Sequence, residues 1–323
     1  MSQQHPIISP YDKSSTASDV LTGLDLHGKT VVITGGHSGL GLATSRALSE
    51  AGAHIIVGAR DVHAAKAAFN DQSGSKRLSG FNGLSDIEVG NLDLADLNSV
   101  RAFANTVLFN EKHIDIVINS AGIMACPEHR IGNGWESQFA VNHLGHFALV
   151  NHLWPALIGG ARVVAVSSAG HQISAIRWHD LHFNEGYDKW QAYGQSKTAN
   201  ALFAVHLDEL GKDVGISAFS LHPGKIFTPL QRFLTNDEMV NSGWIDQEGN
   251  PLDPTFKTPE QGAATQVWAA TSPLLEGLGG VYCEDCNIAD ILVGTTLTGV
   301  KLYAIDHGQA KRLWELSAQL TGI

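Results

Sequence analysis

Short runs of apolar residues alternate with segments of helical periodicity along most of the chain. Apolar runs occupy residues 30–34, 54–58, 87–89, 114–118, 162–166 and 216–220, and helical spacing occupies residues 40–51, 62–69, 97–108, 135–157 and 190–210. Continuous apolar runs are typical of parallel strands that are buried on both faces, with helices as crossover connections. Right-handed crossovers make such a sheet doubly wound, and ligands bind at the carboxyl ends of its strands. The pattern therefore predicts an α/β protein with helices on both faces of a parallel sheet.

The segments that flank this region have a different character. Residues 1–26 are polar, and we expect an N-terminal arm that lies over the domain or is partly disordered. Residues 71–85 form a loop rich in glycine, serine and asparagine, and the mixed segment 226–258 predicts a flap. A helix at 259–271, a strand at 280–282 and an amphipathic helix at 309–320 complete the pattern. We expect a single domain over residues 27–323, because one α/β unit can reach this length and no internal repeat is evident.

Composition narrows the class of protein. The 323 residues are 43 % hydrophobic and 16 % charged, which suits a globular chain with a large buried core. The net charge of −11 argues against nucleic acid or an anionic membrane as the main partner. We expect no membrane span, because there is no run of about 18 uninterrupted apolar residues. The first residues do not resemble a secretory signal and three cysteines make no disulfide framework, so we expect a cytoplasmic protein.

A glycine-rich turn follows the first predicted strand and precedes the first predicted helix. Glycine lets the backbone turn tightly and approach a pyrophosphate, whose charge meets the amino terminus of the helix. The spacing is Gly-x-x-x-Gly-x-Gly rather than the commoner Gly-x-Gly-x-x-Gly. With the strands and helix in place around it, the turn predicts a Rossmann-type dinucleotide-binding fold. The residues expected to contact the cofactor here are Gly35, His37, Ser38, Gly39, Leu40 and Gly41.

The end of the second predicted strand bears on the choice of cofactor. An acidic side chain there holds the ribose 2′-hydroxyl of NAD(H), whereas an arginine accommodates the 2′-phosphate of NADP(H). Arg60 stands two residues past Gly58, which favours NADP(H) and leaves NAD(H) as the alternative. Asp61 argues mildly the other way, although an aspartate there also suits the N-cap of the next helix.

Tyr193 and Lys197 are four residues apart in a predicted helix. Residues at this spacing share one face, about 6 Å apart along the axis. A phenol has a pKa of about 10, and an adjacent cation lowers it, so the pair can act as a general acid/base. A Tyr-x-x-x-Lys spacing by itself also arises by chance on surface helices, and its meaning depends on the rest of the chain.

With the glycine turn and the Tyr/Lys pair on one chain, the sequence resembles the short-chain dehydrogenase/reductase family from about Leu24 onward. Residues 34–41 match the family's Thr-Gly-x-x-x-Gly-x-Gly, and residues 119–122 resemble its Asn-Asn-Ala-Gly with Ser120 as the second residue. The resemblance implies that the catalytic residues are Asn142, Ser168, Tyr193 and Lys197. It implies cofactor contacts from Asp93, Leu94, Asn119, Ala121, Gly122, Tyr193, Lys197, Pro223, Gly224, Ile226 and Thr228.

The family's chemistry implies a role for each catalytic residue. Tyr193 exchanges a proton with the substrate oxygen, and Ser168 hydrogen-bonds that oxygen as charge develops. Lys197 lowers the pKa of the tyrosine and binds ribose hydroxyls, while Asn142 positions water for a proton relay. We therefore expect an NADP(H)-dependent carbonyl reductase or alcohol dehydrogenase. The alternatives are a non-catalytic NADP(H)-sensing regulatory protein on the same fold, and an NAD-dependent dehydrogenase or epimerase.

The later part of the chain bears on substrate and assembly. The flap is rich in large apolar side chains, which predicts a small, fairly apolar ketone, aldehyde or alcohol; Lys225 and Arg232 keep an anionic substrate as the alternative. Residues 179–183 and the segment from Gly280 to Cys286 resemble the members related to retinol dehydrogenases and the WW-domain-containing oxidoreductase. Members of this family often pair through the helix that carries Tyr193, so we expect a homodimer or homotetramer.

We expect no metal site. Cys283 and Cys286 have the spacing of half a zinc site, but no second cysteine pair completes it. His143 and His146 could face one way on a helix, but no acidic residue completes a ligand set with them. His171 and His179 are candidates for shaping the substrate pocket.

Overall fold

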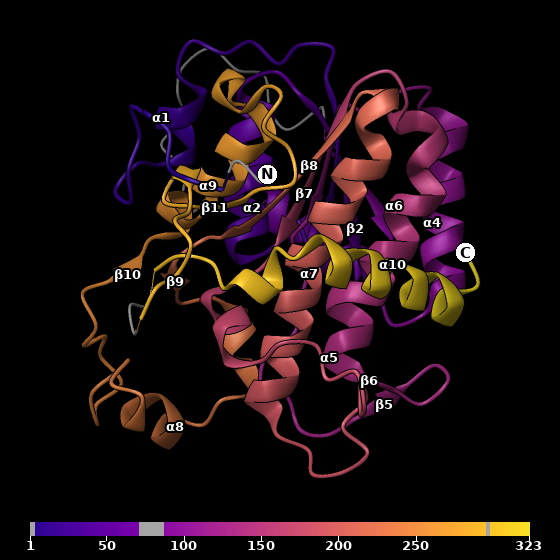
Figure 1. Ribbon diagram of the computed structural model, residues 1–323. Helices are drawn as coiled ribbons and strands as arrows, with labels where there is room; N and C mark the ends of the chain where they lie inside the picture. The colour runs from indigo at the N-terminus through magenta and orange to yellow at the C-terminus, as the bar shows by residue number, and fades with distance from the viewer. Residues whose placement is uncertain (1–3, 71–86, 295–297) are drawn as a thin grey trace.

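An eight-stranded sheet organises the chain in the computed structural model, which describes residues 4–70, 87–294 and 298–323 (Figure 1). The strands lie in the order β12-β11-β8-β7-β4-β1-β2-β3. The pairings from β11 to β3 are parallel, and β12 pairs antiparallel with β11 at one edge. The strands are β1 (Thr30–Thr34), β2 (His54–Ala59), β3 (Ile87–Asn91), β4 (Ile116–Asn119), β7 (Ala161–Val166), β8 (Ile216–His222), β11 (Tyr282–Glu284) and β12 (Asn287–Ile288).

Helices cover both faces of this sheet, as the apolar pattern predicts. Successive side chains of a strand point to opposite faces, and β1 shows the consequence: Val31 and Ile33 join one core cluster and Val32 joins another. The helices α1 (Ala17–Leu21), α2 (Gly39–Glu50), α3 (Val62–Asn70) and α9 (Pro259–Thr271) lie on the first side. The helices α4 (Leu97–Asn110), α6 (Gly145–Leu157), α7 (Lys189–Gly211) and α10 (His307–Thr321) lie on the second. The predicted doubly wound fold is confirmed.

Two predicted elements differ from the observed ones. The helix expected from residue 135 begins only after Glu136, as α5 (Ser137–Phe139), and continues through a π-helical turn at Ala140–Leu144 into α6. The Glu136 carboxylate accepts hydrogen bonds from the amides of Gln138 and Phe139 and so fixes this start. Residues 135–136 instead form β6 (Trp135–Glu136), paired with β5 (Arg130–Ile131). The strand expected at 280–282 begins at Tyr282, because Gly280 has a φ of +77° that a strand does not allow.

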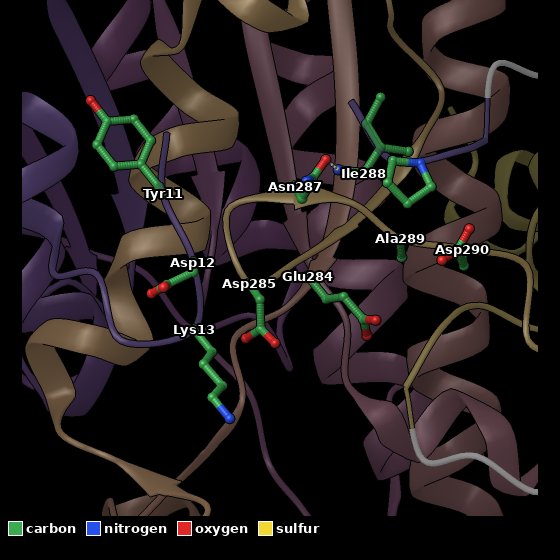
Figure 2. Close-up of a pocket in the computed structure, with 10 residues that line it drawn as sticks. Tyr11, Asp12, Lys13, Glu284, Asp285, Asn287, Ile288, Ala289 and Asp290 are labelled. Atoms are coloured by element: carbon green, nitrogen blue, oxygen red, sulfur yellow. Dashed lines mark hydrogen bonds between the residues drawn. The ribbon is translucent and has the colours of Figure 1, made fainter. Parts of the chain in front are cut away.

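The N-terminal arm lies against the segment that contains β11 and β12. The amide of Gln4 bonds the backbone N–H and C=O of Tyr282 at 2.8 Å each and the carbonyl of Ala289 at 2.6 Å. A hollow of about 360 Å³ lies between the arm and this segment. Figure 2 shows Asp12 and Lys13 on one side of it and Glu284 on the other. Its described lining contains none of the predicted site residues.

The segment predicted as a flap has its own short elements. At its base β9 (Lys225–Ile226) pairs with β10 (Phe256–Lys257), and the rings of Phe227 and Phe256 stack 4.0 Å apart. Between them lie a 3₁₀ turn (Pro229–Phe233) and α8 (Asn236–Asn241), which an ion pair between Glu238 and Lys189 ties to α7. The loop predicted at 71–85 lies outside the described residues. None of the described helices is both long and apolar enough to cross a membrane.

Candidate active site

Tyr193 and Lys197 lie side by side in the second and third turns of α7. The Asp188 carboxylate accepts hydrogen bonds from the amides of Trp190 and Gln191 and so starts this helix just before the pair. Both side chains are 4 % exposed, and the Lys197 Nζ lies 5.6 Å from the centre of the Tyr193 ring. That Nζ donates a hydrogen bond of 3.0 Å to the carbonyl of Val166, at the end of β7. The sheet therefore fixes the ammonium beside the phenol.

Ser168 reaches the same phenol from the loop that follows β7. It hydrogen-bonds the Tyr193 side chain, and its Oγ accepts a bond of 3.0 Å from the amide of Gly170. A Cβ at Gly170 would lie 2.7 Å from the Tyr193 ring and 3.4 Å from the Ser168 Oγ. Glycine is therefore needed for the loop to approach the ring. The amide of Ala169 bonds His222 Nδ1 at 3.1 Å, which ties the loop to β8.

Asn142 stands behind the pair, in the π-helical turn that precedes α6. Its Oδ1 accepts from the amide of Ile123 at 2.9 Å, and its Nδ2 donates to the carbonyl of Ile123 and to the Ser196 Oγ, each at 2.9 Å. The Ser196 hydroxyl in turn donates to the carbonyl of Tyr193 at 2.8 Å. The amide of Asn142 thus joins α7 to the segment that follows β4.

Burial dominates the electrostatics of the pair. It raises the pKa of Tyr193 to about 12, against a lowering by the bond with Ser168, and it lowers the pKa of Lys197 to about 8. Burial of the phenol thus outweighs the lowering of the tyrosine pKa that we expect from its neighbours. At neutral pH the phenol keeps its proton and can act as a hydrogen-bond donor or an acid.

The glycine turn lies at the carboxyl end of β1, and its geometry fits a bound phosphate. Gly35 and Gly39 have φ values of +65° and +49°, and a Cβ at Gly41 would lie 2.3 Å from the carbonyl oxygen of Gly35. The neighbouring Ser38 makes no side-chain bond to the first turn of α2 among the described residues, whereas side chains cap α4, α7, α9 and α10. The first N–H groups of α2 are left for an anion.

The glycine turn connects to the catalytic residues through the end of β4. The Thr34 Oγ1 accepts hydrogen bonds of 3.0 Å from the amides of Ser120 and Ala121. A Cβ at Gly122 would lie 3.1 Å from Asn142 Oδ1 and 3.7 Å from the Lys197 Nζ. Both amide atoms of the buried Asn119 meet no hydrogen-bond partner among the described residues. The small residues predicted to touch the cofactor therefore adjoin the catalytic group.

Residues predicted to select or hold the adenosine half lie at the ends of β2 and β3. Arg60 is exposed, and Asp61 caps α3 by accepting from the amide of Ala64 at 2.9 Å. Asp93 Oδ1 accepts from the amide of Ala95 at 2.9 Å, and the Leu94 side chain next to it is buried. Asp61 therefore acts as the N-cap of α3, as its place in the sequence suggested.

The base of the flap lies against the glycine turn. The Thr228 side chain would meet a Cβ at Gly39 at 3.1 Å, and Ile226 would meet one at Gly262 at 2.7 Å. Gly224, which follows Pro223 after β8, has a φ of +100°. Of these predicted residues, Thr228 lies against the glycine turn, and Ile226 packs against α9.

Apolar side chains close over Tyr193. It forms a small cluster with Met124 and Ala125, and Trp190 and two leucines of the flap, Leu230 and Leu234, pack against this cluster. The sequence did not single out Met124 or Ala125; the only available signal is their position just after the Asn-Ser-Ala-Gly segment. Trp190 lies three residues before Tyr193, which places the two rings 6.4 Å apart edge to face.

The histidine and cysteine candidates have other partners. His143 pairs with Ser317 Oγ at 2.7 Å on α10, whereas His146 pairs with Thr34 on β1, so the two do not face one way. His171 is fully buried, and its Nδ1 lies 2.7 Å from the carbonyl oxygen of Ser168. Cys283 and Cys286 are buried free thiols whose pKa values burial raises. Among the described residues no group of three histidine, cysteine or acidic side chains could hold a metal ion.

Comparisons with known proteins agree with this arrangement. The family model described as short chain dehydrogenase matches residues 29–239. A Streptomyces antibioticus protein named "Probable oxidoreductase" is 43 % identical over 300 residues, covering 90 % of this chain and 97 % of that protein. Retinol dehydrogenase 14 of Homo sapiens is 36 % identical over 312 residues, covering 92 % and 88 %. A solved structure of an uncharacterised protein from Mycobacterium paratuberculosis has a TM-score of 0.70 at 34 % identity, covering 96 % and 98 %. The predicted resemblance to retinol dehydrogenases is confirmed.

Proposed function

The chain belongs to the short-chain dehydrogenase family of oxidoreductases, which act on CH–OH groups, and we propose that it interconverts an apolar carbonyl compound and its alcohol with NADP(H). The observation that carries the proposal is the group formed by the buried Tyr193 and Lys197 and the half-buried Ser168, at the carboxyl end of the sheet and beside the glycine turn. Such an arrangement supplies a proton donor, an oxygen binder and a cation around one point.

The chain's residues handle the substrate oxygen and its proton. When bound, the nicotinamide supplies or accepts the hydride. In the reducing direction the Tyr193 phenol, protonated at neutral pH, donates its proton to the substrate oxygen, and Ser168 hydrogen-bonds that oxygen as charge develops. The neighbouring Lys197 ammonium stabilises the phenolate that Tyr193 becomes. Asn142 then positions a water through which Lys197 and Tyr193 regain protons.

Two arginines support the choice of NADP(H). Arg60 is exposed at the end of β2, and Arg232 of the flap has a pKa lowered by burial and then by the positive charge of Arg60. Two guanidinium groups that repel each other are stabilised by an anion between them, and a 2′-phosphate is such an anion. The carboxylate of Asp61, which would favour NAD(H), is engaged in capping α3.

The apolar surroundings of Tyr193 support a neutral substrate. Met124, Trp190, Leu230 and Leu234 surround the phenol, and Trp190 also meets Trp244 of the flap edge to face at 6.4 Å. Lys225, which kept an anionic substrate as an alternative, is paired with Asp253 at 2.7 Å. We therefore favour a ketone, aldehyde or alcohol whose remaining surface is hydrocarbon. Because Tyr193 is 4 % exposed, the flap leucines must move for such a substrate to reach it.

The substitution Tyr193→Phe tests the proposal. It removes the proton donor and leaves the ring's packing in place, so turnover of a panel of apolar ketones and aldehydes with NADPH should fall by at least a thousandfold. The dissociation constant of NADPH, measured by fluorescence titration, should change less than threefold. The matched control is Tyr11→Phe on the N-terminal arm, which should keep full turnover. Turnover of the Tyr193→Phe variant within tenfold of the unsubstituted chain would refute the role.

The same panel separates the enzyme from its rival, a regulatory protein that senses NADP(H) on this fold. A sensor binds NADPH and turns over no member of the panel, whereas the proposed enzyme oxidises NADPH in the presence of at least one carbonyl compound. The complete set of Asn142, Ser168, Tyr193 and Lys197 favours the enzyme.

A further inference from the structure

Thr34, at the end of β1, is the centre of a buried polar junction. Its Oγ1 accepts from the amides of Ser120 and Ala121 at 3.0 Å each and lies 2.8 Å from Nε2 of His146. The other ring nitrogen of His146, Nδ1, lies 2.9 Å from the backbone carbonyl oxygen of Asn142. His146 is 2 % exposed, so one imidazole spans the distance between the cofactor strand and the helix that carries Asn142.

The partners of the imidazole fix its tautomer. The carbonyl of Asn142 can only accept, so Nδ1 of His146 carries the hydrogen. Burial and then the charge of Lys197 lower the pKa of His146 to about 4, although the bond to the Asn142 carbonyl raises it, so the ring is neutral at pH 7. Its Nε2 is then an acceptor, and the hydroxyl of Thr34 donates to it.

The contact between His146 and the Asn142 carbonyl lies in an irregular part of the helix. Asn142 lies in the π-helical turn Ala140–Leu144, where the amide of Gly145 bonds the carbonyl of Ala140, five residues back. Asn142 donates its two Nδ2 hydrogens to the carbonyl of Ile123 and to the Ser196 Oγ, and its Oδ1 accepts from the amide of Ile123. Its backbone carbonyl accepts from Nδ1 of His146 on one side and has a second lone pair that can accept a hydrogen bond from a relay water.

We propose that His146 is a positioning residue of the proton relay: its Nδ1–H holds the Asn142 carbonyl in the direction that a relay water requires, while Thr34 holds the ring. This inference rests on the proposed function, because it concerns how Tyr193 and Lys197 regain protons after each turnover. It also couples the relay to the cofactor turn, since Thr34 supports the amides of Ser120 and Ala121.

Two substitutions distinguish the hydrogen bond of His146 to the Asn142 carbonyl from its hydrogen bond with Thr34. The amide of an asparagine reaches the place of Nδ1 of a histidine, and that of a glutamine reaches the place of Nε2. His146→Asn therefore retains a donor for the Asn142 carbonyl, whereas His146→Gln retains a partner for Thr34 and loses that donor. The matched control is His152→Gln, which replaces a half-buried histidine of the same helix that faces Arg101.

We expect His146→Gln to lower kcat at least tenfold, with the substrate KM and the NADPH dissociation constant each within threefold of the unsubstituted chain. His146→Asn should lose clearly less, about threefold, and His152→Gln should keep its kcat. The kcat-against-pH profile of His146→Gln should shift by at least half a pH unit, because proton return limits it. Equal losses of kcat in both His146 variants, in step with their thermal midpoints, would overturn the proposal and leave a structural histidine.

A spectroscopic measurement is independent of turnover. In ¹⁵N NMR of the ligand-free chain, the resonances that His146→Asn removes should be those of a neutral ring protonated on Nδ1, at pH 7 and still at pH 5.5. A ring protonated on Nε2 would overturn the inference even if the enzyme is active. If instead the unsubstituted chain reduces no carbonyl compound but shows the Nδ1–H ring, the proposed function fails and the His146 geometry stands.

Discussion

Burial, rather than direct pairing, sets the chemistry of single residues in this site. Tyr193 and Lys197 are both almost completely enclosed, so the pKa of the phenol rises to about 12 and that of the ammonium falls to about 8. Each is held by a backbone carbonyl or a hydroxyl from another element: Val166 for Lys197 and Ser168 for Tyr193. Because its pKa is raised, the Tyr193 phenol keeps its proton at neutral pH and can donate it.

At the same scale, Arg60 should decide between the two dinucleotides. The substitution Arg60→Ala removes an exposed guanidinium at the end of β2, so the KM for NADPH should rise at least tenfold. The KM for NADH, which lacks the 2′-phosphate, should change less than twofold. Steady-state kinetics with each cofactor and one ketone measure both values.

The control for this prediction is Lys66→Ala, which removes another exposed cation from the neighbouring helix α3. It should leave both constants unchanged, because a remote surface charge is screened by salt. Equal increases for NADPH and NADH in Arg60→Ala would mean that Arg60 contacts a part shared by the two cofactors.

At the scale of elements, α7 owes its position to cover from every side. The sheet packs on one face, the 3₁₀ turn at Ala169–Ile173 on another, and α10 lies across α7 and α6 (Figure 1). Trp314 of α10 stacks on Phe203 at 5.6 Å and meets Phe147 edge to face at 4.8 Å. The chain's own α10 thus covers one face of α7, the helix through which we expect subunits to pair.

Truncating Trp314 tests how much the packing of α10 on α7 stabilises the fold. The indole contacts Phe147, Phe203 and His206, and losing it from a half-buried site should lower the free energy of unfolding by about 2 to 3 kcal/mol. Urea denaturation of Trp314→Ala measures the loss, and Glu315→Ala, one exposed residue further along α10, is the control. A loss below about 0.5 kcal/mol would show that α10 is not a stabilising cover.

At the scale of the whole molecule, local sequence patterns predicted the sheet, the helices on its two faces and the glycine turn. They did not predict the contacts between distant segments. The apolar runs predicted six of the parallel strands of the sheet, because a buried strand needs a continuous apolar run. These are β1, β2, β3, β4, β7 and β8. The junction of Thr34 with His146 joins residues 112 positions apart, and Gln4 meets Tyr282 across 278 positions. Neither contact leaves a periodic signal in the sequence, because each depends on how the finished layers meet.

The candidate site divides in the same way. The glycine turn and the Tyr/Lys spacing are local, so the sequence alone located them. Met124 and the flap leucines pack over Tyr193. This contact could not be located from the sequence, because the loop after β4 and the flap after β8 come together only in the folded chain. The π-helical turn at Asn142 was missed, because a single wider turn barely changes the apolar period of a helix that is buried on most sides.

Three buried neutral histidines and the half-buried His222 should make the whole fold sensitive to acid. Burial lowers the pKa values of His143 and His222 to about 3 and those of His146 and His171 to about 4, against about 6.5 in an unfolded chain. Between about pH 6.5 and pH 4 the unfolded chain therefore binds more protons than the folded one. The stability that the neutral histidines contribute is fully present above pH 6.5 and is lost as the pH falls through this window.

The loss should amount to roughly 2 kcal/mol per histidine between pH 7 and pH 5, which for four sites approaches the whole stability of a typical domain. Burial raises the pKa values of Glu136 and Glu284, and their uptake of protons in the folded state offsets part of the loss. Urea midpoints at pH 7, 6 and 5 measure the net slope. His143→Gln, which keeps a partner for Ser317 and cannot titrate, should lose about 2 kcal/mol less over the same range. An unchanged slope in that variant would mean that His143 is already protonated or exposed in the folded chain.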